Sequence, residues 1–286
     1  MAKRFEGKVA IVTGSSNGIG RATAVLFARE GAKVTLTGRN ETALTEAKNE
    51  AIAAGAKESD VLTVVGDLRE ENVQKELVDR TVEKFGKLDI LIHNAGGAAP
   101  DMTPRQGFQM TINDYDYIME LNLRAIVSLT NLAREHLVKS KGEIVVVSSI
   151  AGLPHGNSKM PYYAISKAGL DQYMRALAVE MIEHGVRVNG VNPGIVRTTI
   201  GNKQGATSEV MEQVEQFVLS DKDFLPSRTI GLPEDIAKAI AFLADRNSSS
   251  YIIGHSLVID GGSNLISTLM QMDFAKVLKL TQQQSQ

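Results

Sequence analysis

The chain has 286 residues, 43% of them hydrophobic, and a net charge of −2, a composition that can bury one large core. The near-neutral charge offers no basic surface for nucleic acid, and the absence of cysteine excludes disulfides and thiol catalysis. We find no secretory signal and no span long enough to cross a bilayer, so we expect a cytoplasmic protein without membrane or nucleic-acid partners.

Short apolar runs alternate with longer helical patterns along the chain, as a doubly wound parallel sheet requires. The predicted strands cover residues 9–12, 33–37, 61–65, 90–93, 143–148, 186–191 and 256–259. The predicted helices cover about residues 19–30, 41–54, 70–85, 114–139, 162–184 and 233–244. The pattern therefore predicts a single-domain α/β fold, a mainly parallel seven-stranded sheet flanked by helices.

A glycine-rich turn joins the first predicted strand to the first predicted helix. Its spacing, G-x-x-x-G-x-G, fits neither the P-loop pattern nor the usual G-x-G-x-x-G pattern, which disfavours a P-loop NTPase. Glycines let the backbone turn sharply and approach a ligand, and the amino end of the following helix favours a pyrophosphate. We therefore expect a dinucleotide to contact this turn, which consists of Gly14, Ser15, Ser16, Asn17, Gly18, Ile19 and Gly20.

Tyr163 and Lys167 stand four residues apart, so in a helix both side chains project from one face. A fixed ammonium near a phenol favours the phenolate and lowers its pKa from an ordinary value of roughly 10. Such a tyrosine could serve as a general acid near neutral pH. Taken alone, such a pair arises often by chance and usually marks an ordinary surface helix.

These two motifs, together with Asn94-Ala95-Gly96 and Ser149, resemble the short-chain dehydrogenase/reductase family in order and spacing, over roughly residues 5 to 265. The resemblance implies a Rossmann fold and an enzyme that moves a hydride between a nicotinamide cofactor and a carbonyl or secondary alcohol. It also implies a catalytic domain over residues 1–265, a substrate loop at about 198–227 and a tail over 266–286.

The sequence around residues 13–20, 37–39 and 250–255 is similar to that of a group of nematode dehydrogenases related to tropinone reductases. That similarity indicates no substrate beyond a small-molecule carbonyl or alcohol. With no cluster of metal-ligand type among the five histidines and no cysteines, we expect no metal.

The family resemblance gives four residues catalytic roles: Asn122, Ser149, Tyr163 and Lys167. Tyr163 would exchange the proton and Ser149 would hydrogen-bond the carbonyl oxygen, while Lys167 would hold the nicotinamide ribose and lower the pKa of Tyr163. Asn122 would hold a water against Lys167, or else brace its own backbone as a buried helix asparagine. Ser148 is the rival of Ser149, although alternation in an extended chain turns it the other way.

Cofactor choice depends on the end of the second predicted strand. NAD-selective folds place an acidic side chain there, whereas this chain has Gly38 followed by Arg39. Arg39 can hold a 2′-phosphate with its planar charged fork, and the resemblance therefore favours NADP(H) over NAD(H). The alternative is a solvated arginine that pairs with Glu41. The resemblance adds Asn40, Asp67, Leu68, Asn94, Ala95, Gly96, Pro193, Gly194, Ile195, Val196 and Thr198 as cofactor contacts, with Tyr163 and Lys167.

Three of these neighbouring positions have simpler interpretations. Asp67 could be a strand-end turn or helix cap, and Thr198 a helix cap. His93 stands where many relatives have asparagine, and we expect a packed strand-end residue that donates a hydrogen bond.

The leading interpretation is an NADP(H)-dependent carbonyl reductase or alcohol dehydrogenase. The alternatives are an NAD-dependent sugar or sterol alcohol dehydrogenase and, from a different class, a non-catalytic binding protein that senses the cofactor. The helices at 114–139 and 162–184 resemble those that pack between subunits in family tetramers, so we expect a homo-oligomer, with a tetramer favoured over a dimer.

Overall fold

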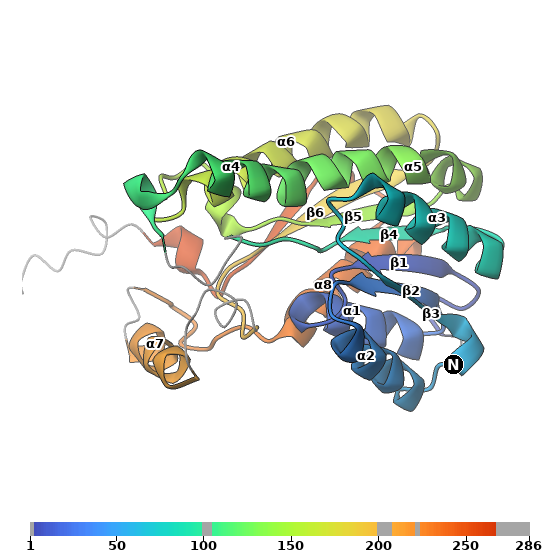
Figure 1. The fold of residues 1–286 in the computed structure, drawn as a ribbon, viewed down its shortest axis with the longest axis horizontal. Coiled ribbons are helices and arrows are strands. Elements are labelled where there is room, and N and C mark those ends of the chain that lie inside the picture. The colour runs from blue at the N-terminus through green and yellow to red at the C-terminus, as the bar shows by residue number, and fades with distance from the viewer. Residues whose placement is uncertain (1–2, 99–104, 199–207, 221–223, 267–286) are drawn as a thin grey trace, which may run out of the picture.

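The computed structural model describes residues 3–98, 105–198, 208–220 and 224–266. At its centre lies a parallel sheet of seven strands in the order β3-β2-β1-β4-β5-β6-β7 (Figure 1). The strands are β1 Val9–Thr13, β2 Lys33–Gly38, β3 Val61–Val65, β4 Ile90–His93, β5 Glu143–Val147, β6 Arg187–Pro193 and β7 Ser256–Ile259. The strand order reverses between β1 and β4, the place where open α/β sheets bind ligands. The predicted α/β fold is confirmed.

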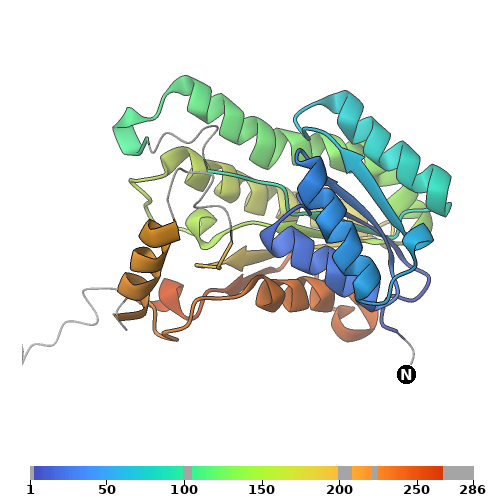
Figure 2. The same ribbon diagram turned by 60° about the horizontal axis from the view of Figure 1, so that its bottom comes forward.

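Helices cover both faces of this sheet (Figures 1 and 2). One layer contains α1 Gly18–Arg29, α2 Glu41–Ala53 and α8 Pro233–Ala244; the other contains α3 Glu71–Phe85, α5 Ala125–Ser140 and α6 Pro161–Ile182. Because both faces are covered, β1, β4, β5 and β6 are buried from end to end. In the described ranges, no helix combines the length and the apolar character that a membrane span needs.

Strand β6 extends two residues beyond the predicted range of 186–191. The extension pairs with the last strand, since Asn192 lies opposite Val258 and Pro193 opposite Ile259. The pairing carries Asn192 and Pro193 to the carboxyl edge of the sheet.

The single helix predicted over 114–139 is instead interrupted. The segment consists of α4 Ile112–Met119, a π-helical turn η3 Glu120–Arg124 and α5. Helix α4 begins at a capping box, in which the Thr111 hydroxyl accepts from the Asp114 amide at 3.3 Å and the Asp114 carboxylate accepts from the Thr111 amide at 2.7 Å. The π turn winds one extra residue into the helix and places Asn122 in the interior.

Several short elements complete the described chain: η1 Glu58–Asp60, η2 Gly107–Gln109, η4 Ile150–Gly152, α7 Ser208–Ser220, α9 Arg246–Ser249 and η6 Ser263–Leu265. Helix α7 stands at one end of the molecule, outside the two helical layers (Figure 2). It falls within the predicted substrate loop of 198–227, whose residues 199–207 and 221–223 lie outside the described ranges. The predicted tail lies outside them too, apart from Ile266.

A buried arginine ties the amino ends of β5 and β6 to the last helices. Arg187, 2% exposed, pairs with Glu143 at 2.8 Å and donates to the carbonyl oxygens of Ser249 at 2.6 Å and Leu243 at 2.8 Å. Arg246 pairs with the same Glu143 at 2.7 Å. Since a buried charge is costly without partners, this network fixes one arrangement of these elements at the end opposite the predicted site.

Candidate active site

The predicted site residues gather at the carboxyl ends of six adjacent strands. Because those strands are parallel neighbours, the segments that follow them share one edge of the sheet. In strand order from β3 to β6, that edge carries Asp67, Arg39, Gly14, Asn94, Ser149 and Pro193.

The glycine turn after β1 has no room for a side chain at Gly14 or Gly20. A Cβ at Gly14 would lie 2.8 Å from the Ala95 Cα, and one at Gly20 would lie 2.4 Å from both the Asn94 Nδ2 and the Gly14 carbonyl oxygen. Gly14 and Gly18 have φ values of +64° and +54°, which glycine adopts without strain. Helix α1 starts at this turn without a side-chain cap from Asn17, so its first amides remain available to an anion. These features fit a dinucleotide pyrophosphate.

Polar side chains hold the turn in shape. The Ser15 hydroxyl accepts from the Thr37 amide at 2.9 Å, and the Asn94 Nδ2 donates to the carbonyl oxygens of Thr13 at 2.9 Å and Gly14 at 3.1 Å. The amides of Asn94 and Ala95 donate to the Thr13 hydroxyl at 2.9 and 3.0 Å. Both donor hydrogens of the Asn94 amide are therefore directed at the turn itself.

His93, at the end of β4, is a core residue. Its Nε2 lies 2.9 Å from the Thr130 hydroxyl, which donates its own proton to the Ile126 carbonyl at 2.7 Å. The imidazole therefore acts as the donor, as the sequence predicted. Burial lowers the pKa of His93 to about 3, so the ring is neutral.

Arg39 lies at the start of a charged cluster on the β2–β3 side of the edge. Its side chain is 56% exposed, with one guanidinium nitrogen 3.3 Å from the Tyr117 hydroxyl and 3.9 Å from the Asp67 carboxylate. Arg69 binds Asp67 at 2.8 Å and its guanidinium carbon lies 4.5 Å from the centre of the Tyr117 ring. Within the described residues, Arg39 forms no ion pair with Glu41, the partner that the alternative interpretation allowed.

Two of the predicted cofactor contacts at this side have structural uses. The Asn40 side chain caps α2 by accepting from the Ala43 amide at 2.9 Å. Asp67 accepts from the Arg69 amide at 3.0 Å, which makes it the strand-end turn that the sequence allowed. Although burial alone would raise the pKa of Asp67, the hydrogen bonds from Arg69 lower it, so the carboxylate is ionised. Leu68 is buried behind it.

Ser149, Tyr163 and Lys167 come together at the end of β5. The Ser149 hydroxyl accepts from the Ala151 amide at 3.1 Å and hydrogen-bonds the Tyr163 phenol. The Lys167 ammonium lies 5.7 Å from the Tyr163 ring centre and donates to the Val147 carbonyl oxygen at 2.9 Å. Ser148, the rival serine, is buried and its hydroxyl donates to the Lys167 carbonyl oxygen at 3.3 Å.

The structure does not show the predicted lowering of the Tyr163 pKa by Lys167. Burial raises the pKa of Tyr163, and the hydrogen bond with Ser149 offsets only part of that rise. Burial also lowers the pKa of Lys167 to about 8, against an opposing effect of Asp171. The sequence-based expectation of a lowered tyrosine pKa was therefore wrong, because desolvation of the buried phenol is the larger effect and raises its pKa.

Asn122 joins the site from the π turn. Its Oδ1 accepts from the Gly97 amide at 2.9 Å, while its Nδ2 donates to the Gly97 carbonyl at 2.9 Å and the Ser166 hydroxyl at 3.0 Å. A Cβ at Gly96 would lie 3.1 Å from the Asn122 Oδ1 and 3.3 Å from the Lys167 Nζ, so both side chains border this glycine. The asparagine braces the β4 segment rather than its own helix.

The turn after β6 closes the edge. The Gly194 amide donates to the Ile259 carbonyl oxygen at 2.9 Å. Val196 forms an isolated β-bridge with Gly231, whose amide donates to the Ile195 carbonyl oxygen at 3.1 Å. Thr198 lies across from the glycine turn, since a Cβ at Gly18 would come 3.1 Å from its Cγ2. The glycine turn and the segment after β6, both predicted to contact the cofactor, therefore lie close to each other.

The sequence analysis missed several polar residues around the site. Asp171, Asn192 and Ser166 are buried and hydrogen-bonded behind the predicted catalytic residues, and Arg69 and Tyr117 surround Arg39. Asp171 had a readable signal, because it follows Lys167 by the same four residues that separate Lys167 from Tyr163. The others depend on contacts between distant segments, which the sequence does not mark.

Comparisons with known proteins agree with this geometry. The family model described as enoyl-(acyl carrier protein) reductase matches residues 14–264. The 3-oxoacyl-[acyl-carrier-protein] reductase FabG of Thermotoga maritima is 34% identical over 260 residues, which cover 91% of this chain and 98% of FabG.

Two solved structures from Caenorhabditis elegans are also similar. A short-chain dehydrogenase/reductase of unknown function, solved with cofactor, shares 44% identity at a TM-score of 0.92 and covers 94% of this chain and 100% of its own. A glucose dehydrogenase in its apo form shares 49% identity at a TM-score of 0.79 and covers 92% of this chain and 100% of its own. The chain therefore belongs to the short-chain dehydrogenase/reductase family, oxidoreductases that act on carbonyl and alcohol groups with a nicotinamide cofactor.

Proposed function

We propose that this protein is an NADP(H)-dependent oxidoreductase that interconverts a carbonyl and a secondary alcohol, with Tyr163 as acid and base. The arrangement of Ser149, Tyr163 and Lys167 beside the glycine turn is the observation that carries the proposal. A hydroxyl, a phenol and an ammonium at one sheet edge suit a reaction that develops charge on an oxygen.

The preference for NADP(H) follows from Arg39. Its guanidinium is exposed at the end of β2, and its nearest carboxylate partner, Asp67, is 3.9 Å away and already bound by Arg69. Neither Gly38 nor Asn40 supplies a carboxylate that would repel a phosphate. A 2′-phosphate would therefore gain a charge-assisted partner in Arg39.

When bound, the nicotinamide would supply the hydride to the carbonyl carbon. The Ala151 amide directs a hydrogen bond at the Ser149 oxygen, so the serine proton can be donated to the substrate oxygen as negative charge develops there. Tyr163 then transfers its phenolic proton to that oxygen, which completes the alcohol. The Lys167 ammonium stabilises the phenolate that remains, until a proton from solvent restores the phenol.

Helix α7 is the proposed cover of the substrate. Arg197, just after the β6 turn, forms an ion pair with Glu215 of α7, and Val218 and Leu225 are buried. Phe217 of α7 and Phe224 meet edge to face at 6.1 Å, and both remain largely exposed. An apolar cover tethered near the catalytic edge is suited to excluding water from a hydride transfer.

A sugar substrate is the second candidate, because the glucose dehydrogenase is 49% identical over 92% of the chain. NAD-linked oxidation of a sugar or sterol alcohol would then replace NADPH-linked reduction. Strong NAD preference despite Arg39 would favour this candidate.

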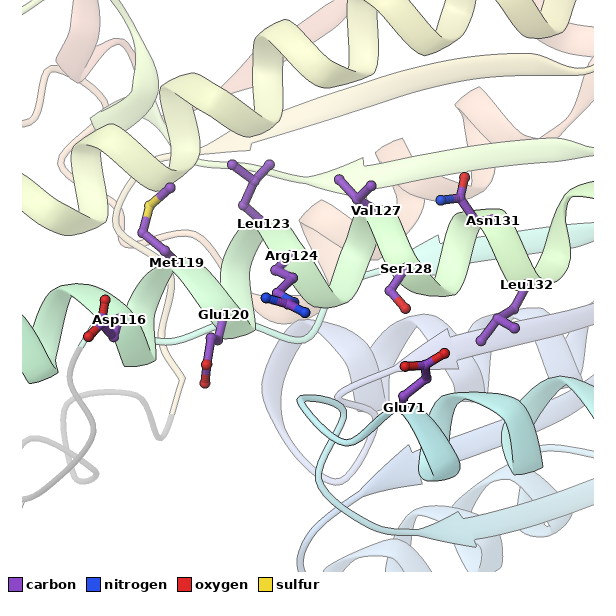
Figure 3. Close-up of a pocket in the computed structure, with 10 residues that line it drawn as sticks. All are labelled: Glu71, Asp116, Met119, Glu120, Leu123, Arg124, Val127, Ser128, Asn131 and Leu132. Atoms are coloured by element: carbon purple, nitrogen blue, oxygen red, sulfur yellow. The ribbon is translucent and has the colours of Figure 1, made fainter.

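We further propose a homo-oligomer, with a tetramer favoured, that uses the outer side of α4, η3 and α5. A groove of about 690 Å³ follows that side (Figure 3). Its apolar residues are half-buried: Met119, Leu123, Val127 and Leu132. Arg124, Glu120 and Asp116 all line the groove, so two copies related by a twofold axis could pair opposite charges. Sedimentation of a Val127→Glu variant tests this interface, since a smaller species is expected.

The function is tested by oxidation of NADPH and NADH against a panel of ketones, diketones, quinones, aldehydes and oxidised sugars. The expected result is NADPH-preferring turnover that falls by about 10²- to 10⁴-fold in Tyr163→Phe, the usual range for a lost general acid. Tyr115→Phe is the matched control, because this phenol packs against Tyr162 on α6 outside the catalytic group. Tight cofactor binding without turnover in either direction would instead favour a cofactor-sensing protein.

A further inference from the structure

A buried carboxylate lies behind the catalytic group. Asp171 is on α6, one helical turn after Lys167 and two after Tyr163, and is 3% exposed. Its Oδ2 accepts from the Nδ2 of Asn192, which is fully buried on β6, at 2.9 Å. The same Nδ2 donates to the carbonyl oxygen of Ser149 at 3.0 Å. Asn192 thus connects the helix of Tyr163 and Lys167 directly to the catalytic serine.

The position of this bridge relates three parts of the site. The Ser149 carbonyl also accepts from the Gly152 amide at 3.0 Å, so its two lone pairs are both occupied. Asn192 is followed immediately by Pro193 and Gly194, two of the predicted cofactor contacts. A shift of Asn192 would therefore move the serine relative to both the phenol and the cofactor turn.

The bridge is costly for stability alone. The second carboxylate oxygen of Asp171 and the Oδ1 of Asn192 are buried and make no hydrogen bond in the described chain. Burying a charge and an unpaired acceptor is unfavourable, and a well-packed apolar pair of similar volume would avoid that cost. A polar pair at this position is therefore better explained by the site than by the core.

The charges that face Asp171 are few. Lys167 and Arg175 act from its own helix, whereas β5 contributes the uncharged Ser148 and β6 the uncharged Asn192. Burial raises the pKa of Asp171, and its neighbours Ser148 and Asn192 lower it. In return, Asp171 opposes the effect of burial on Lys167 and raises its pKa. Within the described residues, the Asp171 carboxylate is the one negative charge that acts on Lys167.

We propose that Asp171 is a positioning residue for the reaction: through Asn192 it holds Ser149 in place, and its charge keeps Lys167 protonated. This inference rests on the proposed function, since it assigns a role relative to Ser149, Tyr163 and Lys167. It predicts two separable effects, one of geometry carried by Asn192 and one of charge carried by Asp171.

Three variants separate the two effects in the carbonyl-reduction assay. Asp171→Asn keeps the shape and removes the charge, Asn192→Leu removes the bridge and keeps the charge, and Asp79→Asn is the exposed control on α3. We expect kcat to fall about tenfold or more in Asn192→Leu with the alkaline limb of the pH profile unchanged, because small misplacements slow chemistry. In Asp171→Asn the alkaline limb should move to lower pH, since loss of a negative charge lowers the pKa of Lys167.

Melting temperature and NADPH fluorescence titration establish that each variant is folded and binds cofactor. If Asp171→Asn fails to fold, Asp171→Glu tests the same idea, because it retains the charge: the wild-type alkaline limb with a lowered kcat is expected. The proposal would be overturned if Asp171→Asn had the same kcat and pH profile as Asp79→Asn. It would also be overturned if Asp171→Glu kept the full kcat but showed a shifted alkaline limb.

A second readout needs no substrate. NMR titration of ¹⁵N-labelled lysine side chains, in the wild type and in Asp171→Asn, each against its Lys167→Met counterpart, reports the ionisation of Lys167. We expect Lys167 to lose its proton at lower pH in Asp171→Asn, and loss of that proton at the same pH would overturn the charge role. Absence of wild-type turnover would refute the proposed function alone, while this titration would still decide the role of Asp171.

Discussion

Replacing Lys167 by methionine is expected to stabilise the folded chain at neutral pH while abolishing turnover. The ammonium is 3% exposed, and burial lowers its pKa from 10.5 to about 8. This difference corresponds to a cost of about 3 kcal/mol whenever the buried group is charged. Lys167→Met removes this cost but also loses the hydrogen bond to the Val147 carbonyl, which contributes about 1 kcal/mol. The variant should therefore be more stable than the wild type by about 2 kcal/mol.

The sign of the pH dependence follows from proton counting. Between pH 8 and 10.5 the unfolded chain holds the lysine proton and the folded chain has lost it, so wild-type stability rises with pH in that window. Below pH 8 both states are protonated and the full cost is present. The advantage of Lys167→Met should therefore shrink by roughly 2 kcal/mol between pH 7 and pH 9.5.

Urea unfolding at fixed protein concentration, at pH 7 and pH 9.5, measures this difference. Lys75→Met, which removes an exposed ammonium 68% open to solvent, is the matched control and should show no such pH dependence. A Lys167→Met variant that is less stable than the wild type at pH 7, or that keeps the same advantage at both pH values, would refute the reasoning.

Three further changes test other parts of the structure. In fluorescence titrations, Arg39→Gln should weaken NADPH binding by about 10- to 100-fold and leave NADH binding nearly unchanged, because only NADPH loses a charged hydrogen-bond partner. Equal losses of affinity for the two cofactors would contradict the assignment of Arg39. Gly20→Ala should abolish binding of both cofactors in the same titrations, since the added Cβ would lie 2.4 Å from both the Asn94 Nδ2 and the Gly14 carbonyl oxygen. Retained affinity would show that the turn adapts to the added methyl group. Arg187→Met should lower the free energy of unfolding by about 3–5 kcal/mol in urea titrations, because it leaves Glu143 with less compensation, and an unchanged midpoint would show that Arg246 suffices.

The sheet was predictable because each strand is a short run of apolar residues bounded by turn residues. The limits of β3, β4 and β7 match the prediction to the residue. The end of β6 was missed because Asn192 and Pro193 do not look like strand residues, and only pairing with β7 keeps them in the sheet. The π turn around Asn122 was missed for a related reason: the contacts that stabilise it come from Gly97 and Ser166.

For the site, motif spacing placed the proposed catalytic side chains at one edge of the sheet, but it did not indicate how deeply each of them is buried. The pKa of Tyr163 depends on how deeply the phenol is buried relative to its distance from Lys167, and neither quantity is written in the four-residue spacing. Asp171 could have been found from the same spacing, whereas its partner Asn192 required the pairing of α6 with β6 in three dimensions.

The most direct test of the central claim follows a labelled hydride. NADPH carrying deuterium on the transferred position of C4 is mixed with the carbonyl compound that the panel shows to react fastest, and the product is analysed by mass spectrometry. The proposed function predicts deuterium on the carbinol carbon of the alcohol, formed by the wild type and Tyr115→Phe and reduced at least about 100-fold in Tyr163→Phe. Alcohol without deuterium, or equal labelling by Tyr163→Phe, would contradict it.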